Sequence, residues 1–139
     1  MITKKIVIPF SINKTSTKGT TLRFFRPRSL VIQLNQSVTF INEDQEDHYL
    51  ESVSLKEKPD RFFETGDIKS GESVIIKFKN FRKMIPFKCK KHPTERGVIF
   101  MIDKRESDMT DTERLRLLTK TADRGEEFWN LIEKFERAQ

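Results

Sequence analysis

Hydrophobic positions in the first hundred residues form short runs rich in Val, Ile and Phe, separated by polar segments. Runs of this length and composition are typical of β-strands, and Asn, Gly and Ser between them are typical of turns. We predict strands at 5–10, 30–34, 37–41, 48–53, 73–79, 85–89 and 97–102. Asn35 and Gln36 are predicted to form a tight turn, and residues 11–21 a loop. The pattern therefore predicts an antiparallel Greek-key β-sandwich over residues 1–103.

After Thr110 the hydrophobic period becomes helical. Thr110 and Glu113 fit a capping box, which stabilises the first turn of a helix. One apolar stripe is predicted from Leu115, Leu118, Ala122, Trp129 and Ile132, broadened by Phe128, Leu131 and Phe135. Gly125 should weaken or divide this helix, because glycine costs about 1 kcal/mol relative to alanine in a helix. Residues 104–139 are thus a C-terminal helical extension, which either packs on the sandwich or forms a homo-oligomer or partner interface.

Cys89 is the only cysteine, so an intramolecular disulfide is excluded and the thiol is buried, reactive or a metal ligand. His92 and Glu95 follow it in one short loop between two predicted strands. Thiolate, imidazole and carboxylate together suit copper or zinc better than magnesium or calcium. The other histidine, His48, begins a strand after the polar loop 42–47. If it meets the Cys89 loop, a site with two histidines and one cysteine results.

The motifs around these residues resemble the cupredoxins, above all the amicyanin and plastocyanin group. The similarity covers about residues 22–102 and includes Val38–Asn42, His48 six residues later, Phe63–Gly66, Ser70–Glu72 and Phe87–Pro93. It implies a cupredoxin-like sandwich with a type 1 copper ion bound in one plane by His48, Cys89 and His92. It also implies that the Asn42 side chain ties the two ligand loops together.

One position departs from that family. Amicyanin-like sequences have the weak axial methionine at the sixth residue after the cysteine, where this chain has Glu95, and neither Met84 nor Met101 replaces it. A carboxylate favours Cu(II) and should lower the reduction potential. As a fourth ligand, Glu95 would resemble the carboxylate of the red copper protein nitrosocyanin in chemistry, although not in alignment. Alternatively, Glu95 turns outward to pair with Arg96 or Lys91 and leaves an open position, as in purple cupredoxins.

The chain carries a net charge of +6, and several basic residues lie near the predicted metal loop. Lys88, Lys90, Lys91 and Arg96 indicate an acidic redox partner protein or a small anion. No nucleic-acid motif accompanies them. The longest apolar run, residues 98–102, is much shorter than the roughly 20 residues of a membrane span. No signal peptide is recognisable, so we expect either a cytoplasmic protein or an exported one that has been trimmed.

Three functions remain open at this point. The first is a mononuclear copper protein that transfers single electrons, and therefore a carrier more than an enzyme. The second is an open-site copper protein that binds or converts nitric oxide or nitrite. The third is a non-redox module that binds or senses copper, or zinc as a substitute, by docking or releasing the helix. Electron transfer is favoured because both histidines are used as ligands and the sequence offers no further catalytic group.

Overall fold

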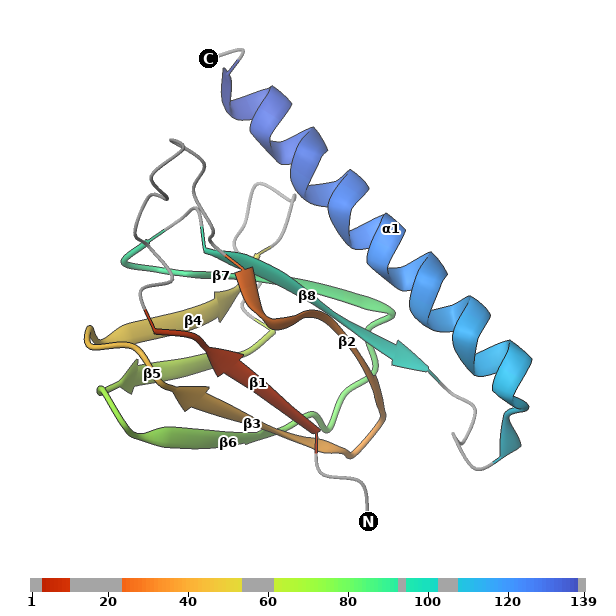
Figure 1. The fold of residues 1–139 in the computed structure, drawn as a ribbon, viewed down its shortest axis with the longest axis horizontal. Helices are drawn as coiled ribbons and strands as arrows, with labels where there is room; N and C mark the ends of the chain where they lie inside the picture. The colour runs from red at the N-terminus through yellow and green to blue at the C-terminus, as the bar shows by residue number, and fades with distance from the viewer. Residues whose placement is uncertain (1–3, 11–23, 54–61, 93–94, 103–107, 138–139) are drawn as a thin grey trace.

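A computed structural model describes residues 4–10, 24–53, 62–92, 95–102 and 108–137 as a β-sandwich with one long helix along its side (Figure 1). The strands are β1 (Lys4–Ile8), β2 (Phe24–Gln33), β3 (Ser37–Asn42), β4 (His48–Ser52), β5 (Glu64–Ile68), β6 (Ser73–Lys77), β7 (Met84–Cys89) and β8 (Arg96–Ile102). The helix, α1, comprises Asp111–Arg137. The predicted β-sandwich with a C-terminal helix is confirmed. The predicted loop at 11–21 lies outside the described residues.

The strands follow the order β5-β4-β7-β8-β2-β1-β3-β6, and β2 passes from one layer to the other. Phe24 and residues 29–33 of β2 pair with β8, whereas Arg26 pairs with Val7 of β1. Two pairs are parallel, β1 with β3 and β2 with β8. The predicted antiparallel pairing was therefore wrong for these two pairs, whereas the other pairs among the described residues are antiparallel as predicted. Side chains alternate along a strand whichever way its neighbour runs, so the hydrophobic pattern could not distinguish the two directions.

Phenylalanine rings fill the space between the layers. Phe87 of β7 lies at the centre of this cluster, with ring centroids 5.3 Å from Phe25, 6.2 Å from Phe40 and 6.0 Å from Phe63. Aromatic pairs at such distances add to the stabilisation that burial provides. Because Phe87 precedes Cys89 by two residues on the same strand, the aromatic core also fixes the strand that presents the cysteine.

The helix begins as predicted but is not divided. The Glu113 backbone N–H donates a hydrogen bond to the Thr110 hydroxyl at 3.1 Å, which confirms the cap. Of the two effects predicted for Gly125, division of the helix is wrong, since α1 runs through this residue without a break. A Cβ atom there would lie 3.0 Å from Ser29 Oγ of β2 and 3.3 Å from a Val98 methyl of β8. Glycine therefore lets the helix approach the sheet closely, and tertiary packing outweighs its low helix propensity.

The helix face that packs on β2 and β8 differs from the predicted stripe. Phe128 is buried and Trp129 is half-buried, as the stripe predicted, but Leu115 and Leu131 are 67% and 59% exposed. The remaining buried or half-buried positions of this face are Leu117, Thr121 and Gly125. The side chains of Leu118, Ala122, Ile132 and Phe135 lie outside the described residues. Within the described part of the chain, no helix is long and apolar enough to cross a membrane.

Gly97→Ala is expected to lower the free energy of unfolding by roughly 2 to 3 kcal/mol, as other overpacked cores do. A Cβ at Gly97 would lie 2.5 Å from Cζ of Phe87 and 3.1 Å from the Arg28 carbonyl oxygen, and neither can move freely. Urea unfolding measures the change. Gly125→Ala is the matched control, because crowding of the Ser29 hydroxyl there is offset by a gain of about 1 kcal/mol in helix propensity. Equal stability of the two variants would contradict this packing.

Candidate metal centre

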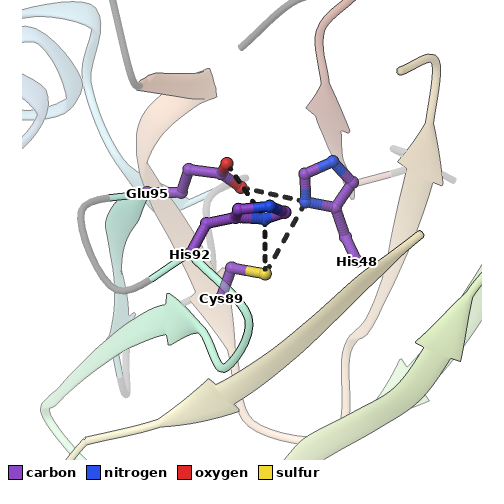
Figure 2. Close-up of side chains that lie close together, drawn as sticks. All are labelled: His48, Cys89, His92 and Glu95. Carbon is purple, nitrogen blue, oxygen red and sulfur yellow. Dashed lines mark hydrogen bonds and ion pairs between the residues drawn. The ribbon is translucent and has the colours of Figure 1, made fainter. Parts of the chain in front are cut away.

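Four side chains from two separate segments of the chain converge on one another (Figure 2). His48 is the first residue of β4, and Cys89 is the last residue of β7. His92 lies in the loop after β7, and Glu95 directly precedes β8. Their potential ligand atoms all lie within 4.8 Å of one another. The structure thus brings together the four residues that the sequence singled out as candidate ligands.

The nitrogen, sulfur and oxygen atoms of these four residues face a common centre. The Nδ1 atoms of His48 and His92 each lie 3.6 Å from the Cys89 sulfur. The same nitrogen atoms lie 2.9 Å and 3.3 Å, respectively, from the two Glu95 carboxylate oxygens. His48, Cys89 and Glu95 are fully buried, whereas 25% of the His92 side chain is exposed. Of the four, His92 is therefore the one that reaches solvent.

The loop after β7 folds back so that Glu95 faces inward. The Glu95 backbone N–H donates to the His92 carbonyl at 2.9 Å, and the Cys89 N–H donates to the Glu95 carbonyl at 3.0 Å. These bonds place the carboxylate beside the cysteine, and its side chain is fully buried. The alternative prediction placed Glu95 outward, in contact with solvent. In this structure its side chain points inward instead.

His48 is held from its other side by a residue that the sequence analysis missed. Its Nε2 atom lies 2.8 Å from Oδ2 of the buried Asp44. The Ser70 hydroxyl donates to the Asp44 carbonyl at 2.6 Å, and the Asp44 N–H donates to the Asn42 side chain at 2.9 Å. A carboxylate on the second ring nitrogen orients a metal-ligating histidine and raises its basicity. The signal was present in the sequence as an acidic residue four positions before His48.

Asn42 fastens the loop that precedes His48. Its side-chain amide donates to the carbonyls of Glu46 and Ile68, both at 2.8 Å, and it is fully buried. These bonds tie the acidic loop to the end of β5. Among the described residues, the hydrogen bonds of the Asn42 side chain stabilise the loop that carries His48.

The chemistry of the cluster favours a cation at its centre. Both carboxylate oxygens of Glu95 are buried, and their neighbours within reach are the Nδ1 atoms of His48 and His92, an arrangement that is costly unless a positive charge compensates. Burial lowers the pKa of His48, but the Cys89 sulfur and the carboxylates of Glu95 and Asp44 beside its ring together raise that pKa to about 10. The same negative surroundings would stabilise a metal ion, and the set of one sulfur, two nitrogens and one carboxylate fits copper or zinc.

The four basic residues predicted to contact a partner differ in their exposure to solvent. Lys90 is exposed, with its ammonium group 5.1 Å from the centre of the Tyr49 ring, and Lys88 is half-buried. Lys91 is exposed and pairs with Asp67 at 2.9 Å. Arg96 is only 8% exposed and therefore lies largely away from any surface that a partner could contact.

The exposed edge of the site also carries negative charge. Nε2 of His92 lies 3.3 Å from an exposed carboxylate oxygen of Glu46. Each histidine thus has one nitrogen toward the centre of the cluster and a carboxylate near the other. The surface around His92 consequently contains both signs of charge.

No protein-family model matches the sequence, and comparison with curated proteins gives no significant match. Several solved structures are similar. A purple cupredoxin from Nitrosopumilus maritimus has a TM-score of 0.59 and 22% identity, and the alignment covers 71% of this chain and 99% of that one. The reduced Cu(I) form of an amicyanin mutant has a TM-score of 0.53 and 15% identity over 72% and 82% of the two chains.

A copper-containing nitrite reductase from Thermus scotoductus SA-01 is similar over a smaller part of its own length. Its TM-score is 0.54 at 20% identity, and the alignment covers 75% of this chain but 23% of the reductase. At these levels of identity the comparison establishes the fold. The described chain therefore has the cupredoxin fold that its sequence motifs predicted, with a cluster of His48, Cys89, His92 and Glu95 that is compatible with a type 1 copper site.

Proposed function

We propose that the protein binds one copper ion through His48, Cys89, His92 and Glu95 and transfers single electrons. The observation that carries this proposal is the convergence of the two Nδ1 atoms and a buried carboxylate on the Cys89 sulfur. The cupredoxin fold supports copper as the metal, and two of the similar proteins are described as copper proteins. Bound copper would accept one electron from a donor as Cu(II) and pass it on to an acceptor as Cu(I).

The chain's own contribution is to hold the ligands in one arrangement for both oxidation states. Backbone hydrogen bonds join Cys89, Glu95 and His92 within one tight loop. Asp44 holds His48 at 2.8 Å from the opposite side. Ligands that are fixed in advance limit the rearrangement that accompanies electron transfer. The partly exposed His92 provides the shortest connection between the buried cluster and a docked redox partner.

Electron transfer is supported over the alternatives by Glu95. Its carboxylate is buried 2.9 Å from Nδ1 of His48, where it would serve as the fourth ligand and take the position that nitric oxide or nitrite would need. Zinc accepts the same ligand types, but nothing in the similar structures supports it. The proposal that the exposed Lys90 and Lys91 attract an acidic partner predicts that electron transfer to such a partner slows as ionic strength rises.

Titration with Cu(II), followed by optical and paramagnetic resonance spectroscopy, tests the proposal. One equivalent should produce an intense thiolate-to-copper absorption that disappears reversibly on reduction. Saturating nitrite or nitric oxide should leave the spectra unchanged, and a clear change would favour the open-site alternative. Binding of zinc in preference to copper, with no thiolate-to-copper band, would overturn the proposed function.

Asp44→Asn is expected to raise the reduction potential of bound copper by about 60 mV or more, a tenfold change in relative affinity for the two oxidation states. The Asp44 carboxylate accepts a hydrogen bond from His48 and adds a buried negative charge, and both effects stabilise Cu(II). Removal of a carboxylate that hydrogen-bonds to a metal-ligating histidine typically changes metal affinity by about 10- to 100-fold, so a tenfold change is at the lower end of that range. A spectroelectrochemical titration measures the shift.

Glu46→Gln is the matched control for Asp44→Asn. Its carboxylate lies 3.3 Å from the other histidine but is exposed, so solvent screens its charge. We expect a smaller upward shift for this variant. A shift at Asp44 that is downward, or no larger than that at Glu46, would contradict the role assigned to Asp44.

A further inference from the structure

Helix α1 contacts the strand that follows the metal loop. The Trp129 indole N–H donates a hydrogen bond to the Gly97 carbonyl at 3.1 Å. The Arg96 guanidinium lies over the Trp129 ring, 4.8 Å from its centre, and Arg96 is largely buried there. Arg96 and Gly97 are the first two residues of β8. A single side chain of the helix therefore holds the start of this strand in two ways.

The start of β8 is also where Glu95 is fixed. Glu95 directly precedes Arg96, and its carbonyl accepts the hydrogen bond from the Cys89 N–H at 3.0 Å. The following pairs, Lys88 with Arg96 and Phe87 with Gly97, continue the β7–β8 ladder away from the cluster. Gly97 lies tightly against the Phe87 ring, so that the strand is confined from both sides. A shift of the strand start would therefore move Glu95.

We propose that Trp129 is a positioning residue for Glu95, an inference that rests on the proposed function of Glu95 as a copper ligand. By fixing Arg96 and Gly97, Trp129 keeps the Glu95 carboxylate within reach of the cluster, 2.9 Å from Nδ1 of His48. The C-terminal helix thus supports the metal centre in addition to covering β2 and β8. If the helix docked more loosely, the bond between the Glu95 carboxylate and copper would weaken. Because that carboxylate stabilises Cu(II), Cu(I) would then be favoured.

A double-mutant cycle tests whether Trp129 acts through Glu95. The Trp129→Ala variant should change the relative affinity for Cu(I) and Cu(II) by about tenfold, which corresponds to an increase of about 60 mV in a one-electron potential. Trp129→Phe keeps an aromatic ring beneath Arg96 but lacks the indole N–H, so its shift should be smaller. In a Glu95→Met background, Trp129→Ala should cause no comparable shift. Equal shifts in both backgrounds would overturn the proposal.

Hydrogen exchange of the metal-free protein separates this inference from the proposed function. In Trp129→Ala, the amides of Cys89 and Glu95 should exchange about fivefold faster, the effect expected from losing one hydrogen bond's worth of local stability. The amide of Phe40 in β3 should be unaffected, which excludes global unfolding. Leu115→Ala, on an exposed part of the same helix, is the matched control and should change none of these rates.

The outcomes of the two experiments are distinguishable. If copper-loaded wild-type protein shows no thiolate-to-copper absorption, the proposed function fails, yet faster exchange at Glu95 in Trp129→Ala would still show that the helix positions this residue. If copper binds as proposed but exchange at Cys89 and Glu95 is the same in Trp129→Ala and wild type, Trp129 does not position Glu95.

Discussion

Cys89→Ser is expected to abolish the intense visible absorption of the Cu(II)-loaded protein. That absorption arises from charge transfer between a thiolate and copper, and Cys89 is the only cysteine in the chain. A serine hydroxyl stays protonated near neutral pH and is a poor copper ligand. Removal of a partner that only touches a ligand already costs about 10- to 100-fold in metal affinity. Loss of the thiolate itself should therefore weaken copper binding by at least about 100-fold.

The fold of the Cys89→Ser variant should persist, because the two side chains have similar size. Its buried hydroxyl should lower the free energy of unfolding by about 1 to 3 kcal/mol in the metal-free state. Cys89→Ala, which introduces no hydroxyl, controls for this cost and should lose the same absorption. Absorption and copper titration of the three proteins, with urea unfolding of their metal-free forms, make the comparison. Retained colour in either variant would refute Cys89 as the ligand.

Glu95→Met is expected to move the spectrum toward that of a blue copper site and to raise the potential by at least about 60 mV. A carboxylate is a hard, negatively charged ligand that stabilises Cu(II), whereas a thioether is neutral, soft and weak. The effect should be large because Glu95 is fully buried, so that solvent does not screen its charge. Optical and paramagnetic resonance spectra and a redox titration of the paired proteins measure it.

Glu95→Gln separates the charge of this residue from its shape. The amide occupies nearly the same volume but is neutral, so its potential should lie between those of the wild type and Glu95→Met. Identical spectra for wild type and Glu95→Met would show that the carboxylate does not coordinate copper. In that case the open-site function, with nitrite or nitric oxide as a ligand, would become the better explanation.

The strands that were predicted correctly carry their signal locally. β3 alternates buried and less buried positions, and β7 and β8 are nearly continuous apolar runs, so neighbouring residues suffice to identify them. β5 was not predicted as a strand because Glu64–Ile68 contains one buried hydrophobic residue, Ile68. Its conformation depends on pairing with β4, which no local pattern records.

In the candidate site, too, some features follow from residues close in sequence and others from contacts between distant segments. Cys89, His92 and Glu95 lie within seven residues, so their proximity follows from the chain itself. His48 lies 41 residues from Cys89 and entered the set through its chemistry and its resemblance to cupredoxin motifs. That Glu95 faces the cluster became evident only from the buried position of its carboxylate.

By itself, the sequence determined the type of fold, most of the strands, the helix cap at Thr110 and the four candidate ligands. These features depend on side-chain periodicity, on short-range hydrogen bonds and on the chemistry of a few metal-binding residue types. Only the tertiary structure decided the parallel strand pairs, the face of α1 that packs, the inward turn of Glu95 and the contacts of Asp44 and Trp129. Each of these depends on close packing between distant segments, where a displacement of one ångström separates contact from no contact.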